Sequence, residues 1–131
     1  MNSAIEVLKS NYEGKEGSFI YSLHEECKFE KSAFWDYYNS IVDLTKDTLS
    51  QDSLDREISL MLSKTYAFIM RSLLWHFHPK DLYKVKGVPK NKLHLYIERL
   101  EIAYLGYFKG DVFKEELHDE DLINPSYRKN R

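Results

Sequence analysis

The chain has 131 residues, of which 43% are hydrophobic and 15% aromatic. That composition supplies one apolar core and excludes a largely disordered chain. Nineteen basic and twenty-one acidic residues leave a net charge of −2, so no global positive field attracts nucleic acid or an anionic membrane. We expect one domain over residues 1–131.

The sequence predicts a soluble, cytoplasmic protein. Its single cysteine, Cys27, excludes an internal disulfide and is typical of a reducing cytosol. Residues 1–14 lack the basic start and apolar run of a secretion signal. The most apolar window, 67–77, contains Arg71 and His76 and has about half of the ~20 residues that span a bilayer.

Two helices are expected in the first fifty residues. Ser3 is the predicted N-cap of a short helix from Ala4 to about Lys9, which ends before Gly14. Residues 18–23 could form a short extended segment, although no partner strand is evident. Ser32 is the predicted N-cap of a longer helix, whose apolar residues recur at helical spacing as far as Leu49.

Residues 53–78 have the pattern of one long helix, with Ser53 as its N-cap and Pro79 as its stop. The helix is apolar on most of its circumference, which predicts a position in the middle of a helical domain. Its polar residues recur at every seventh position: Glu57, Lys64, Arg71 and His78.

A basic loop follows over residues 79–91, with four lysines and two prolines. Loops of this length are usually functional or mobile. We expect Leu82, Tyr83 and Val85 to hold it against the domain.

Asn91 is the predicted N-cap of the last long helix, which ends at Lys109 and Gly110. We expect Ala103 and Gly106 to let a neighbouring helix approach closely. The predicted apolar face consists of Leu93, Ile97, Leu100, Tyr104 and Tyr107.

The last segment, residues 111–131, is an acidic and then basic tail with a possible helical turn at 112–117. The whole pattern predicts an all-α, single-domain helical bundle with a long central helix and a possible short extended segment near the N-terminus.

An arginine followed on a helix by a histidine resembles the motif of HEPN ribonucleases, in which the pair polarises a ribose hydroxyl and its phosphate. Arg71 with His78 or His76 is the candidate pair here. Seven residues place His78 on the same face as Arg71, whereas His76 lies about 140° away. No other catalytic group stands out, so we expect no catalytic residue, no cofactor and no metal site.

The acidic segment at residues 115–121 contains five carboxylates in seven positions. Such an array attracts a basic protein partner, and nearby aromatic residues supply the apolar anchors that interfaces need. The predicted partner-binding residues are Glu115, Glu116, Asp119, Glu120, Asp121, Tyr107 and Phe113.

About two thirds of the chain resembles immunity family 41 of bacterial polymorphic-toxin and contact-dependent growth inhibition systems. The resemblance lies in four segments: FWDYYNSI at 34–41, HFHPKDLYKVKGVP at 76–89, YIERLEIAYLGYFKG at 96–110 and NPSYR at 124–128. It implies a cytoplasmic protein, not an enzyme, that binds and neutralises a cognate toxin domain.

The resemblance transfers no catalytic or interface residue, and the toxin, often a nuclease in this family, is covered at its active site or an exosite. The weak net charge departs from the strongly acidic immunity proteins that face basic nucleases. Two alternatives stay open: the ribonuclease with Arg71, and a helical adaptor for another protein. No membrane and no direct nucleic-acid partner is expected, and the oligomeric state is left open.

Overall fold

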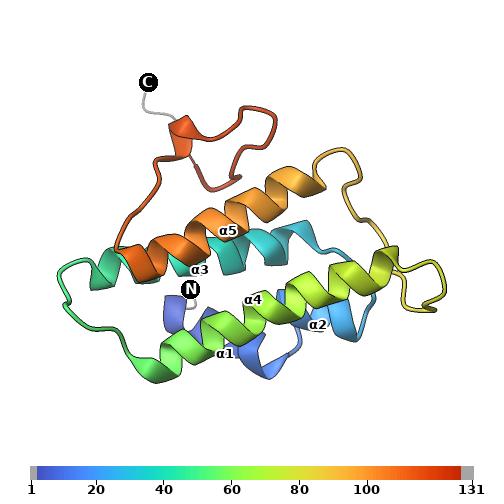
Figure 1. Ribbon diagram of the computed structural model, residues 1–131, viewed down its shortest axis with the longest axis horizontal. Coiled ribbons are helices and arrows are strands. Elements are labelled where there is room, and N and C mark those ends of the chain that lie inside the picture. The colour runs from blue at the N-terminus through green and yellow to red at the C-terminus, as the bar shows by residue number, and fades with distance from the viewer. Residues whose placement is uncertain (1–2, 128–131) are drawn as a thin grey trace.

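The computed structural model describes residues 3–127. Within this range the chain forms five α-helices and a short 3₁₀ helix, with no strand (Figure 1). The predicted all-α single-domain bundle is confirmed. The elements are α1 (Ala4–Glu13), α2 (Phe19–His24), α3 (Lys31–Thr48), α4 (Arg56–Phe77), α5 (Leu93–Lys109) and η1 (Glu115–Leu117).

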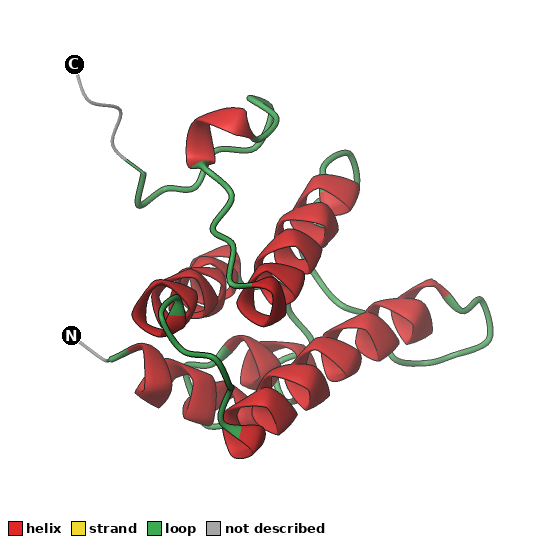
Figure 2. Ribbon diagram, turned by 60° about the vertical axis from the view of Figure 1, so that its left-hand side comes forward, coloured by secondary structure: helices red, strands yellow, loops and turns green. Residues whose placement is uncertain are grey.

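The helices pack in two layers, with α4 and α5 in front of α1, α2 and α3 (Figure 1). Two helices pack between others: α3 contacts α1, α2 and α5, and α1 contacts α2, α3 and α4. The longest helix, α4, was expected in the middle, but it packs on α1 and α2 and lies at the edge of the helices (Figure 2). Its outward residues Leu60, Leu74 and Phe77 are exposed, because this helix has two apolar sides and only one is fully covered.

An aromatic cluster joins the two layers. The ring of Phe34 packs edge-on against Phe19, Trp35 and Tyr96, with centroids 5.5, 5.3 and 4.9 Å away. Such pairs contribute about 0.5–1.5 kcal/mol beyond the burial of their area. They connect α2, α3 and α5 around one core.

Residues 18–23, a possible extended segment from the sequence, instead form the N-cap Ser18 and most of α2. The N–H groups at the start of this helix have acceptors from the chain before it. Ser18 Oγ accepts from Tyr21 N–H at 3.1 Å, and the buried Asn11 Oδ1 accepts from Phe19 and Ile20 at 3.0 and 3.3 Å. A six-residue helix is stable here because these contacts satisfy the first backbone N–H groups, which have no acceptor within the helix.

A single parallel β-bridge joins Lys28, after α2, to Lys86 in the basic loop. Phe29 N–H donates to the carbonyl of Lys86, and Lys86 N–H donates to that of Cys27, both at 2.8 Å. Val85 is buried, and Tyr83 Oη donates to the Leu23 carbonyl at 2.6 Å. Tyr83 and Val85 thus hold the loop as predicted.

The third predicted anchor of the loop, Leu82, is 98% exposed, so that prediction was wrong. Among residues 3–127 it is the most exposed of the large apolar residues.

Helix ends were predicted with mixed success. Ser3 caps α1, and α4 ends next to Pro79, but α1 continues to Glu13 and stops at Gly14, whose φ is +64°. The predicted N-caps Ser32, Ser53 and Asn91 were wrong, and the observed cap positions are Glu30, Asp55 and Lys92. Asp55 replaces Ser53 because its carboxylate accepts from the N–H groups of Glu57 and Ile58 at 2.9 and 3.1 Å.

The core side of α5 includes Leu100 and Tyr107, as predicted, and also Arg99. Gly106 was expected to admit a neighbouring helix, but the close neighbour is the returning chain. A Cβ at Gly106 would lie 2.5 Å from the Asp111 carbonyl oxygen. The chain therefore turns back tightly after Gly110, and the turn predicted at 112–117 is observed as η1 at Glu115–Leu117.

We predict that Asp55→Ala lowers the free energy of unfolding by about 1 kcal/mol, because two N–H groups at the start of α4 lose their acceptor. Ser53→Ala is the matched control and should leave stability within about 0.5 kcal/mol of the parent. Urea unfolding followed by circular dichroism measures both. Equal losses in the two variants would contradict the assignment of the cap.

Candidate protein-binding surface

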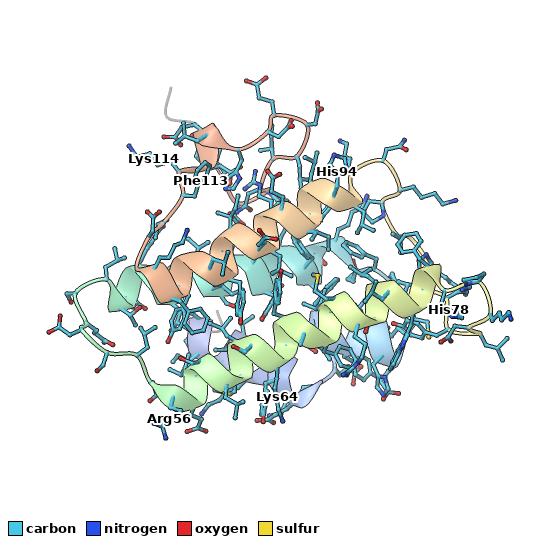
Figure 3. All side chains as sticks on the ribbon, in the orientation of Figure 1. Arg56, Lys64, His78, His94, Phe113 and Lys114 are labelled. Carbon is cyan, nitrogen blue, oxygen red and sulfur yellow. The ribbon has the colours of Figure 1, made fainter. Side chains whose placement is uncertain are left out.

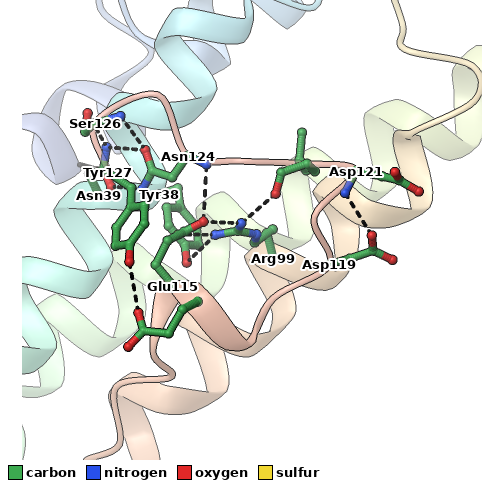
Figure 4. A network of polar contacts seen from close by, with 11 residues as sticks. Tyr38, Asn39, Arg99, Glu115, Asp119, Asp121, Asn124, Ser126 and Tyr127 are labelled. Carbon is green, nitrogen blue, oxygen red and sulfur yellow. Dashed lines mark hydrogen bonds and ion pairs between the residues drawn. The ribbon is translucent and has the colours of Figure 1, made fainter. Parts of the chain in front are cut away.

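Residues 111–127, called here the C-terminal lobe, fold back beside α5 and α3 (Figure 1). Arg99 is 2% exposed and binds this lobe from α5. Its guanidinium makes a two-pronged ion pair with the carboxylate of Glu115. It also donates to the Leu122 carbonyl at 2.7 Å and to Tyr38 Oη at 3.4 Å (Figure 4).

Further contacts fix the lobe to α3. The side-chain amide of Asn124 donates to Asn39 Oδ1 at 2.7 Å, and Asn124 N–H donates to Glu115 at 3.3 Å. The Arg99 guanidinium also lies over the rings of Trp35 and Tyr38, 5.5 and 5.7 Å from their centroids. The donors of the buried arginine are therefore satisfied from three directions, which a buried charge requires.

The electrostatics of the ion pair favour both charged forms. Burial acts to raise the pKa of Glu115, but hydrogen bonds from Arg99 and from the Asn124 backbone outweigh it, so the pKa lies below its usual value. Burial acts to lower the pKa of Arg99, but the contacts with Glu115 and Tyr38 have the larger effect, so the pKa lies above its usual value. Glu115 is thus held in its charged form by its pairing with Arg99.

The outer side of the lobe is acidic and carries exposed apolar side chains. Glu116, Asp119, Glu120 and Asp121 are all exposed. Between and beside them in the sequence, Phe113, Leu117 and Ile123 are 42, 64 and 61% exposed. Figure 3 shows Phe113 beside Lys114 on this lobe, apart from α4. We call these four carboxylates and three apolar residues the acidic surface.

Two of the predicted partner-binding residues do not lie on this surface. Tyr107 is 1% exposed and belongs to the core, and Glu115 is bound to Arg99. Sequence reasoning missed Leu117 and Ile123, although apolar residues flanking a run of acids were a usable signal. Arg99 was also missed, because a single arginine on a helix gives no sign of its burial.

His118 lies inside the lobe, 4.7 Å from the ring of Phe113. It is 8% exposed, and its Nε2 has no hydrogen-bond partner among residues 3–127. Burial lowers its pKa, as does the charge of Arg99, while Glu115 and Glu98 oppose this. The folded lobe therefore favours a neutral His118.

Arg71 and the two histidines of the candidate ribonuclease pair are engaged separately. The Arg71 guanidinium lies over Phe68 and Trp75, 5.5 and 5.4 Å from their centroids. It lines a hollow of about 660 Å³ between α1, α2 and α4, which neither histidine lines.

The two histidines instead hold the basic loop. His76 Nδ1 accepts from Val85 N–H at 2.8 Å, and His78 Nδ1 accepts from Lys80 N–H at 3.2 Å. Burial lowers the pKa of His76, helped by Lys84 and Lys90. The spacing argument assumed that the helix includes His78. In the structure His78 lies past the last helical residue, Phe77, so helical spacing does not fix its position relative to Arg71.

Among residues 3–127, no three His, Cys, Asp or Glu side chains gather where they could hold a metal ion. In the same range, every helix is too short or too polar to cross a bilayer. No family model, curated protein or solved structure matches this chain. The candidate site is therefore defined by its own geometry and charge.

We predict that Arg99→Met costs about 3–5 kcal/mol of stability, because it leaves the Glu115 carboxylate partly buried without its partner. Adding Glu115→Gln should recover part of that loss, since the unpaired charge is removed. Urea unfolding measures stability, and limited proteolysis measures the release of residues 111–127. Lys114→Met, at an exposed neighbour, is the control and should change neither.

The lowered pKa values of His118 and His76 predict a stability that depends on pH. Near pH 6.5 and below, these histidines bind protons in the unfolded chain, whereas their lowered pKa values keep them neutral in the folded chain until a lower pH. The contribution of these histidines to the free energy of unfolding is therefore fully present above about pH 6.5 and decreases as the pH falls below that value. At lower pH, protonation of Glu115 removes a further contribution, since its folded pKa is lowered.

Urea unfolding at a series of pH values from about 5 to 8 checks this dependence. His118→Gln should reduce its slope, and His94→Gln, on the exposed side of α5, controls for the loss of one histidine. A slope that is the same in the parent and His118→Gln would contradict the role of His118.

Proposed function

We propose that this protein is an immunity protein that binds a cognate bacterial toxin domain and neutralises it without catalysis. The toxin, which could be a nuclease, is covered at its active site or at an exosite by the acidic surface. The proposal that this is an immunity protein rests on the resemblance to immunity family 41. The proposed way in which it binds the toxin rests on the acidic surface.

The observation that carries the proposal is an acidic surface on a preorganised support. Exposed carboxylates steer a basic partner and set its orientation, and adjacent exposed apolar groups give the desolvated contacts that hold it. Here Phe113, Leu117 and Ile123 are exposed and neighbour the four exposed carboxylates in the sequence. Since Arg99 already holds the lobe in place, little ordering is required on binding.

The biological test is co-expression. The toxin domain encoded beside the gene for this protein should arrest growth of a bacterial host, and co-expression of this protein should restore growth. The two purified proteins should also form a complex. Absence of both rescue and complex would overturn the proposal, while a complex without rescue would indicate an adaptor.

We predict that neutralising the acidic surface slows association with the toxin domain by about tenfold or more at low salt. The variant is Glu116→Gln, Asp119→Asn, Glu120→Gln and Asp121→Asn, which leaves Glu115 in place. Stopped-flow mixing at several salt concentrations measures the rate, and the difference should shrink at high salt because ions screen it.

The matched control neutralises four exposed carboxylates on α1, α2 and their connections, Glu6, Glu13, Glu16 and Glu25. It changes the net charge equally but leaves the acidic surface intact. An equal slowing in both variants would show that only total charge matters, which contradicts a local site.

A protein that works by binding has no substrate to turn over. Incubation of the purified protein with total RNA tests the ribonuclease alternative directly. Cleavage that disappears in Arg71→Ala would replace the proposal with an enzyme, and intact RNA agrees with it.

A further inference from the structure

The outer face of α4 carries a mainly apolar row that the fold covers only in part. Its members are spaced alternately by three and four residues: Leu60, Ser63, Ala67, Met70, Leu74 and Phe77. Leu60, Leu74 and Phe77 are 49, 72 and 60% exposed. Ala67 is exposed, and Ser63 and Met70 are half-buried. We call these six residues the α4 row.

This spacing is the one by which two helices pack along each other, because it keeps one stripe in line over several turns. The row spans eighteen residues, which is about 27 Å at 1.5 Å per residue. Its second and third residues, Ser63 and Ala67, are small, and both of its ends are large. A ridge on a second helix therefore fits at Ser63 and Ala67 and is held by the larger side chains on either side.

The row lies on a rigid support. The opposite side of α4, with Leu62, Ile69 and Leu73, is buried in the domain. At the edge of the row, Ser63 Oγ lies 3.0 Å from Tyr104 Oη, and the rings of Tyr66 and Tyr104 stack at 4.3 Å. These contacts tie α4 to α5, so the exposed row is held in one conformation.

The charged residues that α4 itself carries within the span of the row are basic. They are Lys64 and Arg71, both exposed and adjacent to the row on the helix surface. Figure 3 shows Lys64 along α4 and His78 just past its end. The contacts of Arg71 with Phe68 and Trp75 keep its guanidinium on this flank. A planar guanidinium held in this way is suited to pair with a carboxylate.

We propose that the α4 row binds an amphipathic α-helix of a partner protein whose apolar stripe is flanked by acidic residues. This goes beyond the proposed function, which uses the acidic surface of the C-terminal lobe and a basic partner.

A second copy of this chain fits the charges less well. In an antiparallel pairing about the middle of the row, Lys64 of one copy faces Arg71 of the other, and like charges repel. In a parallel pairing the same two side chains face Ser59 and Tyr66, which offer no negative charge.

The test uses the full-length protein and two helical peptides with the same leucine and alanine stripe, one flanked by glutamates and the other by lysines. Titration calorimetry measures their affinities. The glutamate peptide should bind about tenfold or more tightly at low salt than the lysine peptide, and this preference should fade at about 1 M salt. Reversing charge with Lys64→Glu and Arg71→Glu should invert the preference.

A matched pair of variants separates the row from general exposed apolar surface. Leu74→Glu lies in the row and should weaken binding of the glutamate peptide by about tenfold or more. Leu82→Glu replaces a leucine that is 98% exposed but lies on the basic loop, and it should leave binding unchanged. Circular dichroism confirms that both variants fold, which is expected since both side chains are exposed.

Four results would overturn this proposal. They are no binding of either peptide at about 1 mM, equal binding of both, equal losses in Leu74→Glu and Leu82→Glu, and a different occupant of the row. Sedimentation would reveal a second copy as a dimer that Leu74→Glu dissociates. Flotation with phosphatidylcholine and phosphatidylglycerol vesicles would reveal a membrane surface instead. None of these measurements uses a toxin, so this proposal and the proposed function fail independently.

Discussion

The ion pair between Arg99 and Glu115 is the contact on which the C-terminal lobe depends. Moving two charges out of water costs several kcal/mol for each ion, and only good geometry with further hydrogen bonds recovers that cost. Here the recovery comes from the Leu122 carbonyl, from Tyr38 and from the rings of α3. The pair therefore selects one position for the lobe, and that position presents four carboxylates outward.

The rest of the molecule is a two-layer helical bundle in which α1 and α3 pack between the other helices. The aromatic cluster around Phe34 joins the layers, while the stacked Tyr66 and Tyr104 hold the front layer together at its surface. This packing leaves one face of α4 only partly covered. The protein consequently presents two surfaces of different character, one acidic on the C-terminal lobe and one apolar with a basic flank on α4, with α5 between them (Figure 1).

The positions of the three long helices could be predicted from the sequence, since periodic apolar residues and the stops at Pro79 and Gly110 act within a few turns of chain. Their caps could not, because Ser53 and Asp55 are both acceptable acceptors and only the backbone path decides between them. The helix at 19–24 was missed for a similar reason. Its N–H groups are satisfied by Asn11, which belongs to another helix.

Of the candidate site, the run of acidic residues was evident from composition, and its exposed members follow from local polarity. What only the tertiary structure decided is which of its residues face a partner. Glu115 turns inward because Arg99, sixteen residues away, is buried opposite it, and Tyr107 is enclosed by the core. The sequence by itself determined the three long helices and the charge, which are local properties. The placement of α4 and the orientation of the lobe were decided by contacts between distant segments, since a side chain's burial depends on what packs against it.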